Sequence, residues 1–257
     1  MSAVEELAGL LAASRRVTTF SGAGISTESG IPDFRSAGGV WTRYDPRDFT
    51  FDRYVASAQV RADSWAMRRE FFARDVQPNA AHRAVARIEE LGRGHGVVTQ
   101  NIDGLHQAAG STDVVEIHGT AREVACIGHH PRHGTPEGCG FSATYRWAFE
   151  RIDAGDPDPS CPDCGGLVKS ATVSFGQVLP EGAVERATML ATTADLLLTV
   201  GSSLQVWPAA DLPVWAVRAG VALVIVNDEP TPLDDLATLV VRGRAGEVLP
   251  EAVGPLG

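Results

Sequence analysis

Short apolar runs alternate with helix-length segments along this chain, and that alternation limits the possible folds more than any other feature. The runs are rich in Val, Leu and Ile, and the stretches between them are long enough for the crossover connections that parallel strands need. The pattern predicts an α/β fold, a parallel sheet with helices on both faces. The predicted strands span residues 17–20, 97–99, 114–117, 196–200 and 221–226.

Two of the segments show helical periodicity. Residues 2–14 carry apolar side chains at positions 4, 7, 10 and 11, which lie on one face of a helix. Residues 79–91 repeat this pattern, and Gly92 follows as a stop signal.

Two stretches depart from the strand–helix alternation. Residues 121–170 contain all four cysteines and a stretch of Gly, His and Pro that is typical of loops, which indicates an inserted module. Residues 36–76 are rich in Arg, Asp and aromatic side chains and are expected to form a second, helical insertion. We therefore assign residues 1–35, 77–120 and 171–257 to a sheet domain, and the two insertions to a smaller domain.

The cysteines have the spacing of a structural metal site. Cys161 and Cys164 are separated by two residues, and a Gly-Gly pair follows them. Two cysteines with this spacing typically supply half of the ligands of a tetrahedral zinc site. The other half is irregular, because Cys126 is followed only at a distance by Cys139. Cys126 and Cys139 are the favoured remaining ligands, and His129 in place of Cys139 is the alternative.

The charge balance restricts the partners. The chain of 257 residues has 22 Lys and Arg against 32 Asp and Glu, a net charge of −10. This acidity disfavours direct binding to nucleic acid or anionic lipid. No apolar run is long enough to cross a membrane, the N-terminal segment lacks the basic start of a signal peptide, and the cysteine usage fits a reducing compartment. A cytoplasmic protein is expected.

A glycine-containing loop follows the first predicted strand. In Gly22-Ala23-Gly24 the missing side chains would let the backbone approach a dinucleotide pyrophosphate. The third glycine does not have the usual spacing, so a plain structural turn is the alternative. Further along the loop, a proline turn presents Asp33, Phe34 and Arg35, which could cover a bound nucleotide.

Polar residues follow the other predicted strands, at the edge where open α/β sheets bind their ligands. His118 is a candidate general base there, because its ring titrates near neutral pH. Helix capping by Asn101 or Asp103, a structural role for the histidine, and plain turns are the alternatives. The candidate ligand-binding residues at these strand ends are Gln100, Asn101, Asp103, His118, Gly201, Ser202, Ser203 and Asn227.

Several long motifs, in this order, resemble those of the sirtuins, NAD-dependent protein-lysine deacylases, and in particular the bacterial type. The similarity extends from about residue 7 to 253. The motifs are GAGISTESGIPDFR (22–35), TQNIDGLHQAAG (99–110), EIHGT (116–120), CPDC (161–164), SFGQVLP (174–180) and GSSLQVWPAA (201–210).

The resemblance implies a Rossmann-like domain that binds NAD, a small domain with a helical module and a zinc ribbon, and an acyl-lysine peptide between them. In the family reaction the acyl oxygen attacks C1′ of the nicotinamide ribose, and the catalytic histidine then deprotonates a ribose hydroxyl. The products are nicotinamide, free lysine and O-acyl-ADP-ribose. His118 matches the catalytic histidine, and Asn101 and Asp103 match residues that hold the nicotinamide and ribose.

The resemblance also assigns the remaining contacts. Substrate contacts are expected from Ile102, Val173, Phe175, Gly176 and Val206. Cofactor contacts are expected from Gly22, Ala23, Gly24, Asp33, Phe34, Arg35, Gln100, Asn101, Ile102, Asp103, Gly201, Ser202, Ser203, Asn227 and Ala245.

Two departures from the family pattern affect the expected substrate. Gln177 stands where many relatives have glutamate, and Trp65 stands where desuccinylating relatives have the tyrosine of a Tyr-x-x-Arg pair, although Arg68 is present. A deacetylase is therefore favoured over an enzyme for succinyl or longer acyl groups. A mono-ADP-ribosyltransferase, a non-catalytic NAD sensor and a hydride-transferring dehydrogenase are the alternatives.

Overall fold

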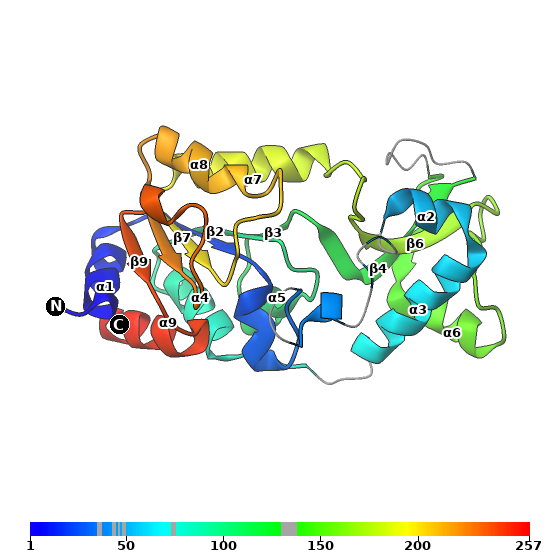
Figure 1. Cartoon of the computed structure of the whole chain (residues 1–257), viewed down its shortest axis with the longest axis horizontal. Helices are drawn as coiled ribbons and strands as arrows, with labels where there is room; N and C mark the ends of the chain where they lie inside the picture. Colours follow the sequence, from blue (N-terminus) through cyan, green and yellow to red (C-terminus); the bar gives the residue numbers. More distant parts are fainter. Residues whose placement is uncertain (35–37, 43–44, 46, 48–49, 73–75, 130–137) are drawn as a thin grey trace.

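A parallel sheet forms the larger part of the molecule (Figure 1). The structure, a computed structural model, describes residues 1–34, 38–42, 45, 47, 50–72, 76–129 and 138–257. Within these ranges, six strands pair in the order β3-β2-β1-β7-β8-β9, and every neighbouring pair is parallel. Their bounds are β1 Val17–Ser21, β2 Gly94–Thr99, β3 Val114–Glu116, β7 Leu196–Val200, β8 Ala222–Val226 and β9 Leu239–Val241.

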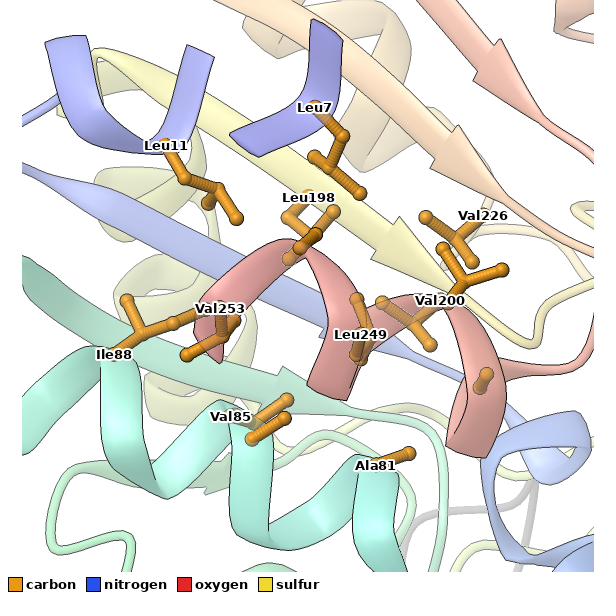
Figure 2. Close-up of a cluster of buried hydrophobic side chains, with 14 of the residues drawn as sticks. Leu7, Leu11, Ala81, Val85, Ile88, Leu198, Val200, Val226, Leu249 and Val253 are labelled. Carbon is orange, nitrogen blue, oxygen red and sulfur yellow. The ribbon is translucent and has the colours of Figure 1, made fainter. Parts of the chain in front are cut away.

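Helices cover both faces of this sheet, because alternate side chains of its buried strands point to opposite sides. On one face, Leu198 and Val200 of β7 pack against α1 (Ala3–Ala13), α4 (Ala80–Glu90) and α9 (Ala245–Val253), as Figure 2 shows. On the other face, Leu197 of the same strand packs with side chains of α7 (Glu181–Thr193) and α8 (Asp211–Arg218). The sheet thus has a core on each side.

A second, antiparallel sheet lies at the other end of the molecule (Figure 1). It has the order β5-β4-β6, with β4 at Gly119–Gly128, β5 at Ser142–Thr144 and β6 at Leu167–Thr172. The helices α2 (Phe51–Ala56), α3 (Ala58–Phe72) and α6 (Tyr145–Asp153) lie beside it. A buried cluster that includes Trp65, Val124, Ala148 and Val168 joins α3, α6 and the sheet.

The remaining elements are short. They are η1 (Ala23–Ser29), η2 (Val40–Thr42), α5 (Leu105–Ala109), η4 (Asp234–Leu236) and η5 (Gly254–Leu256). No helix in the described ranges is both long and apolar enough to span a membrane.

The expected fold class is confirmed: a parallel sheet covered on both faces, with a separate small sheet. Both predicted helices are present as α1 and α4, and all five predicted strands are present within a few residues of their expected bounds. The strand predicted for residues 114–117 is one residue shorter in the structure, where β3 ends at Glu116. His118 lies beyond the end of this strand. The edge strand β9 was not predicted, since its three residues give too short an apolar run to stand out.

Candidate active site

A large cleft opens at the carboxyl ends of β1, β2, β7 and β8. Its volume is about 2040 Å³, and both the parallel sheet and the small antiparallel sheet contribute residues to its walls. Ligand pockets commonly measure about 300–1,000 Å³, so this cleft has room for more than one ligand. Its walls include nearly all the residues proposed from the sequence: Gly22, Ala23, Gly24, Asp33, Phe34, Gln100, Asn101, Ile102, Asp103, His118, Val173, Phe175, Gly176, Gly201, Ser202, Ser203, Val206, Asn227 and Ala245. Arg35 lies outside the described residues.

The glycine loop passes so close to the end of β7 that no side chain fits. A Cβ atom on Gly24 would lie 2.8 Å from the carbonyl oxygen of Gly201, and one on Gly22 would lie 2.9 Å from the same oxygen. Gly24 N–H donates to that carbonyl at 2.8 Å. The glycines are thus needed for packing of backbone on backbone, which puts the start of η1 at the rim of the cleft.

Polar side chains that follow β2 form a network with η1. Asn101 Nδ2 donates to the carbonyl of Gly22 and to Ser26 Oγ, both at 3.1 Å. Ser26 Oγ in turn donates to Asp103 Oδ2 at 2.8 Å. The other oxygen of Asp103 accepts from Leu105 N–H at 2.9 Å, at the start of α5. Asp103 is not the N-cap of α5, which is Gly104, but one of its oxygens binds the first N–H of that helix while the other belongs to the cleft network.

Gln100 connects β2 to the loop after β7. Its Nε2 donates to Ser202 Oγ at 2.9 Å, and its backbone N–H donates to the carbonyl of Ser21. Three separate strand ends therefore meet at one place, as expected for ligand-binding residues of an open α/β sheet.

One ring nitrogen of His118 forms a hydrogen bond with the backbone. Nδ1 lies 3.0 Å from the carbonyl oxygen of Gln100, and because a carbonyl can only accept, Nδ1 carries the hydrogen. The neutral ring then has its free lone pair on Nε2. Burial lowers the pKa of His118 below its usual value, although the bond to Gln100 opposes that shift. His118 is therefore a neutral base at pH 7.

Two buried histidines behind this network were not proposed from the sequence. His82 Nε2 lies 3.5 Å from Ser26 Oγ, and the ring of His106 packs edge-on against that of His82 at 5.0 Å between centroids. Burial lowers the pKa of His82 to about 4 and that of His106 to about 3. The one available signal was the position of His82 in the first turn of the helix predicted for 79–91.

The segment after β6 forms another wall of the cleft. Val173 N–H donates to the carbonyl of His118 at 2.8 Å, which ties this wall to the candidate base. Phe175 is 46% exposed, and its carbonyl accepts from Phe51 N–H at 2.9 Å. Val206, on the loop before α8, contributes to the same cleft.

Arg68 and Trp65 lie on one helix but face different surroundings. Arg68 lines the cleft, and its Nη2 donates to Thr172 Oγ1 at 2.9 Å. No carboxylate forms an ion pair with it in the part of the chain that the structure describes. Trp65 is only 2% exposed and packs in the buried cluster beside the small sheet. The side chain that replaces the family tyrosine therefore does not line the cleft.

The four cysteines converge at the end of the small sheet. Their Sγ atoms all lie within 4.8 Å of one another, with 3.6 Å between Cys126 and Cys164 and between Cys139 and Cys161. Four thiolates at the usual zinc–sulfur distance would be about 3.8 Å apart, so the donor set fits tetrahedral Zn²⁺. Backbone N–H groups also point at two of the sulfurs, Gly128 at Cys126 and Gly166 at Cys164.

This geometry favours Cys139 as the second ligand of the irregular half. Within the described residues the cluster contains no histidine, so His129 is not one of its members. Four thiolates would leave no open position on the ion, and such a site is structural.

Comparisons with known proteins agree with the geometry. The profile of the Sir2 family matches residues 22–208. NAD-dependent protein deacetylase 1 of Bradyrhizobium diazoefficiens is 46% identical over 98% of this chain and 96% of its own length. NAD-dependent protein deacetylase 2 of Streptomyces coelicolor is 45% identical over 94% of this chain and 98% of its own length.

Solved structures share the fold over the whole chain. A Sir2 enzyme with a deacetylated p53 peptide and 3′-O-acetyl-ADP-ribose is 37% identical, with a TM-score of 0.87 and 98% of both chains covered. A Sir2 complex with p53 peptide and NAD⁺ is 37% identical, with a TM-score of 0.86 over 99% of this chain and 98% of the other. From the matching profile, the relatives and the shared architecture, it follows that the chain belongs to the Sir2 family.

Proposed function

We propose that this chain is an NAD-dependent protein-lysine deacetylase that releases nicotinamide and O-acetyl-ADP-ribose. The observation that carries the proposal is the orientation of His118. Its Nδ1–H is held by the carbonyl of Gln100, which leaves Nε2 as a neutral proton acceptor in a cleft rimmed by the glycine loop. The deacetylases of Bradyrhizobium and Streptomyces, which are near-full-length relatives, support the same activity.

The cofactor residues are those that surround the ends of β1, β2, β7 and β8. When bound, NAD supplies a glycosidic bond that breaks to release nicotinamide and a ribose that takes up the acyl group. Asn101 and Asp103 are held by Ser26 in one orientation, so they are ready to bind and orient polar groups of the cofactor. Ser202 and Asn227, at the ends of β7 and β8, are placed to bind the adenosine side.

The acyl-lysine peptide would lie between the segment at Phe175 and Gly176 and the loop at Val206. A peptide that binds as an added strand uses main-chain hydrogen bonds, which tolerates varied sequences. Val173 and Ile102, which line the same cleft as His118, would give apolar walls to the passage for the lysine side chain. An apolar passage excludes water from the reacting acyl group. His118 Nε2 then accepts the proton of a ribose hydroxyl, the step that general base catalysis requires.

One assay separates this proposal from its rivals. The protein is incubated with NAD and an acetyl-lysine peptide, and the products are identified by mass spectrometry. We expect nicotinamide, free-lysine peptide and acetyl-ADP-ribose in equal amounts. Nicotinamide with ADP-ribosylated protein and an intact acetyl group would establish a mono-ADP-ribosyltransferase. If the protein bound NAD without turnover, it would be a sensor. If reduced nicotinamide formed, it would be a dehydrogenase.

The acyl preference needs its own test, because Arg68 favours a second candidate. A guanidinium that lines the cleft without a carboxylate partner in the described ranges could bind an acidic acyl chain. Trp65, which stands where desuccinylating relatives have tyrosine, argues for an acetyl substrate, since no tyrosine hydroxyl assists Arg68. We expect a higher kcat/KM for acetyl-lysine than for succinyl-lysine peptides. Any succinyl activity should fall more than the acetyl activity in Arg68→Met, and a succinyl preference in the unaltered protein would contradict the proposal.

Basic, lysine-containing protein segments are the proposed substrates, in agreement with the net charge of −10. The cytoplasmic location and the lack of nucleic-acid partners stay predictions from composition.

A further inference from the structure

The helix α3 (Ala58–Phe72) contacts two functional parts of the molecule. Arg61, Trp65 and Arg69 are spaced four residues apart, so they lie on one face of the helix. All three contact the module that contains the four cysteines. Met67, Arg68 and Phe71 of the same helix line the cleft, so α3 contacts both the module that contains the cysteines and the candidate active site. Arg61 and Trp65 are the buried residues of this helix.

Trp65 connects α3 to the cysteine cluster by packing alone. It belongs to the same buried cluster as Cys126 and Cys161, two of the proposed zinc ligands. Its indole N–H has no hydrogen-bond partner in the described part of the chain. The position of this ring is therefore set by packing within the cluster to which two of the proposed metal ligands also belong.

A partly buried ion pair makes a second connection. The guanidinium of Arg61 is bound to both oxygens of Asp158 at 2.8–3.0 Å, and Asp158 comes three residues before Cys161. The remaining nitrogen of Arg61 donates to the carbonyls of Tyr54 and Val55, at the end of α2. Bidentate charge-assisted pairs of this kind hold a fixed geometry. Further along the helix, Arg69 pairs with Asp153 of α6.

α3 also contacts β6 beside the cleft, through Arg68, which comes three residues after Trp65 and seven after Arg61 and so projects from the same side of the helix. Arg68 donates to Thr172, and Thr172 immediately precedes Val173, whose N–H is bound to the carbonyl of His118. A shift of α3 would therefore move the wall against which the acyl-lysine lies. These links from α3 lead to Asp158, Asp153 and Thr172, on the small-sheet side of the cleft, so we expect the NAD side to keep its position.

We propose that Trp65 and the Arg61–Asp158 pair are positioning groups through which the zinc-binding module holds the acyl-lysine end of the cleft in place. Zinc at the four cysteines then favours binding of the acyl-lysine peptide and leaves binding of NAD unchanged. The inference rests on the proposed deacetylase function, and it assigns to the metal site an effect on substrate affinity besides stability.

The first test uses Asp158→Asn and Trp65→Phe in the zinc-loaded protein. Both variants should keep one zinc per chain and the NAD affinity of the unaltered protein. Because α3 is no longer held, KM for an acetyl-lysine peptide should rise about tenfold or more while kcat changes little. Glu150→Gln, which removes an exposed carboxylate of α6, is the matched control and should have no effect. Asp158→Glu keeps the carboxylate and should restore most of the peptide affinity.

The second test removes zinc from the unaltered protein with a chelator and follows hydrogen exchange. Amide exchange should rise in residues 58–72 and 167–172, and remain unchanged in β1 and β2. Calorimetry should show lost affinity for the acetyl-lysine peptide and retained affinity for NAD. The proposal would be overturned if zinc removal weakened peptide and NAD binding equally or left amide exchange in α3 unchanged. It would also be overturned if KM for the peptide were unchanged in both variants. A protein that binds the peptide in this zinc-dependent way but never turns it over would instead contradict the deacetylase function.

Discussion

His118 shows how one backbone contact assigns a chemical role to a side chain. The ring has two nitrogens, and the carbonyl of Gln100 takes the hydrogen of Nδ1. The lone pair is thereby left on Nε2, the only ring nitrogen that can accept a proton from a substrate. The sequence predicted the histidine, but this assignment depends on a contact with a residue eighteen positions away.

We expect His118→Ala to lower kcat by about 10²–10⁴-fold, the usual contribution of a general base. NAD binding should persist, because the glycine loop and Asn101 are not altered. Mass spectrometry of the peptide and calorimetry with NAD measure the two effects separately. His95→Ala is the control, since His95 lies on β2 away from the cleft and bonds Thr193. A variant with undiminished turnover would exclude His118 as the base.

The pH profile should report the same group. Burial lowers the pKa of His118, so the folded enzyme holds the neutral, active ring to lower pH than a free histidine would. The rate should fall on the acid side with a midpoint below about 6.5. Single-turnover rates between pH 5 and 8 measure it. A midpoint above 7 would mean that another group limits the reaction.

The site residues that the sequence indicated are those at strand ends or in long motifs. Ser26 and His82 were not proposed, because a serine inside a loop and a histidine in the first turn of a helix have common structural explanations. Only the fold brings Ser26 within hydrogen-bond distance of both Asn101 and Asp103. The sequence favoured Cys139 over His129, and the positions of the four sulfur atoms supply a physical reason for that choice.

At the scale of elements, α9 holds the sheet and the cofactor loop together. Leu249 is fully buried among side chains of α1, α4 and the sheet (Figure 2). At the start of the same helix, Gly246 N–H donates to the Glu28 carboxylate of η1 at 2.7 Å. A negative charge at this end of a helix is favourable.

Leu249→Ala should lower the free energy of unfolding by about 2–5 kcal/mol, because it leaves a cavity in a tightly packed core. Met189→Ala, which truncates a side chain that is 47% exposed, should change it by no more than about 0.5 kcal/mol. Urea unfolding followed by circular dichroism provides both values. Equal effects of the two substitutions would contradict the packing described here.

The histidine pair between α4 and α5 should make the fold sensitive to acid. In the unfolded chain both rings take up protons near pH 6.5, but in the folded chain only near pH 4 for His82 and pH 3 for His106. The neutral rings therefore contribute stability above pH 6.5, and this contribution is lost as the pH falls toward those values.

Urea unfolding at pH 7.5, 6 and 5 measures this loss. His106→Gln, which cannot be protonated, should lose less stability across the same range than the unaltered protein. An identical slope in both proteins would show that the pair does not contribute.

The elements were predictable in proportion to the strength of their periodicity. The helices α1 and α4 and the central strands have long apolar patterns, and they appear within a few residues of the expected bounds. The edge strand β9 and the small antiparallel sheet depend on tertiary pairing, which no local pattern reports. The residue boundaries of the two domains stay a prediction.

At the scale of the whole molecule, the charge of −10 bears on substrate capture. The cleft walls include carboxylates of Glu181, Glu185, Asp228 and Glu229. Attraction between exposed charges weakens as salt shortens the screening length. KM for a lysine-rich acetyl peptide should therefore rise between 50 and 500 mM salt, by roughly the few-fold typical of surface charges.

An acetyl peptide with neutral flanks is the control, and its KM should stay nearly constant over the same range of salt. Steady-state rates at fixed NAD provide both series. If the two peptides responded alike, the acidity of the chain would have no part in choosing its substrates.

The hydrogen bond from Val173 to His118 also bears on how the two sheets can move. β4 begins at Gly119, directly after the histidine, and β6 ends at Thr172, directly before the valine. Two of the chain's passages between the sheets thus run side by side through the reaction centre. Relative movement of the two sheets is therefore restricted at this point, because the bond fixes the two passages to each other where they join the small sheet.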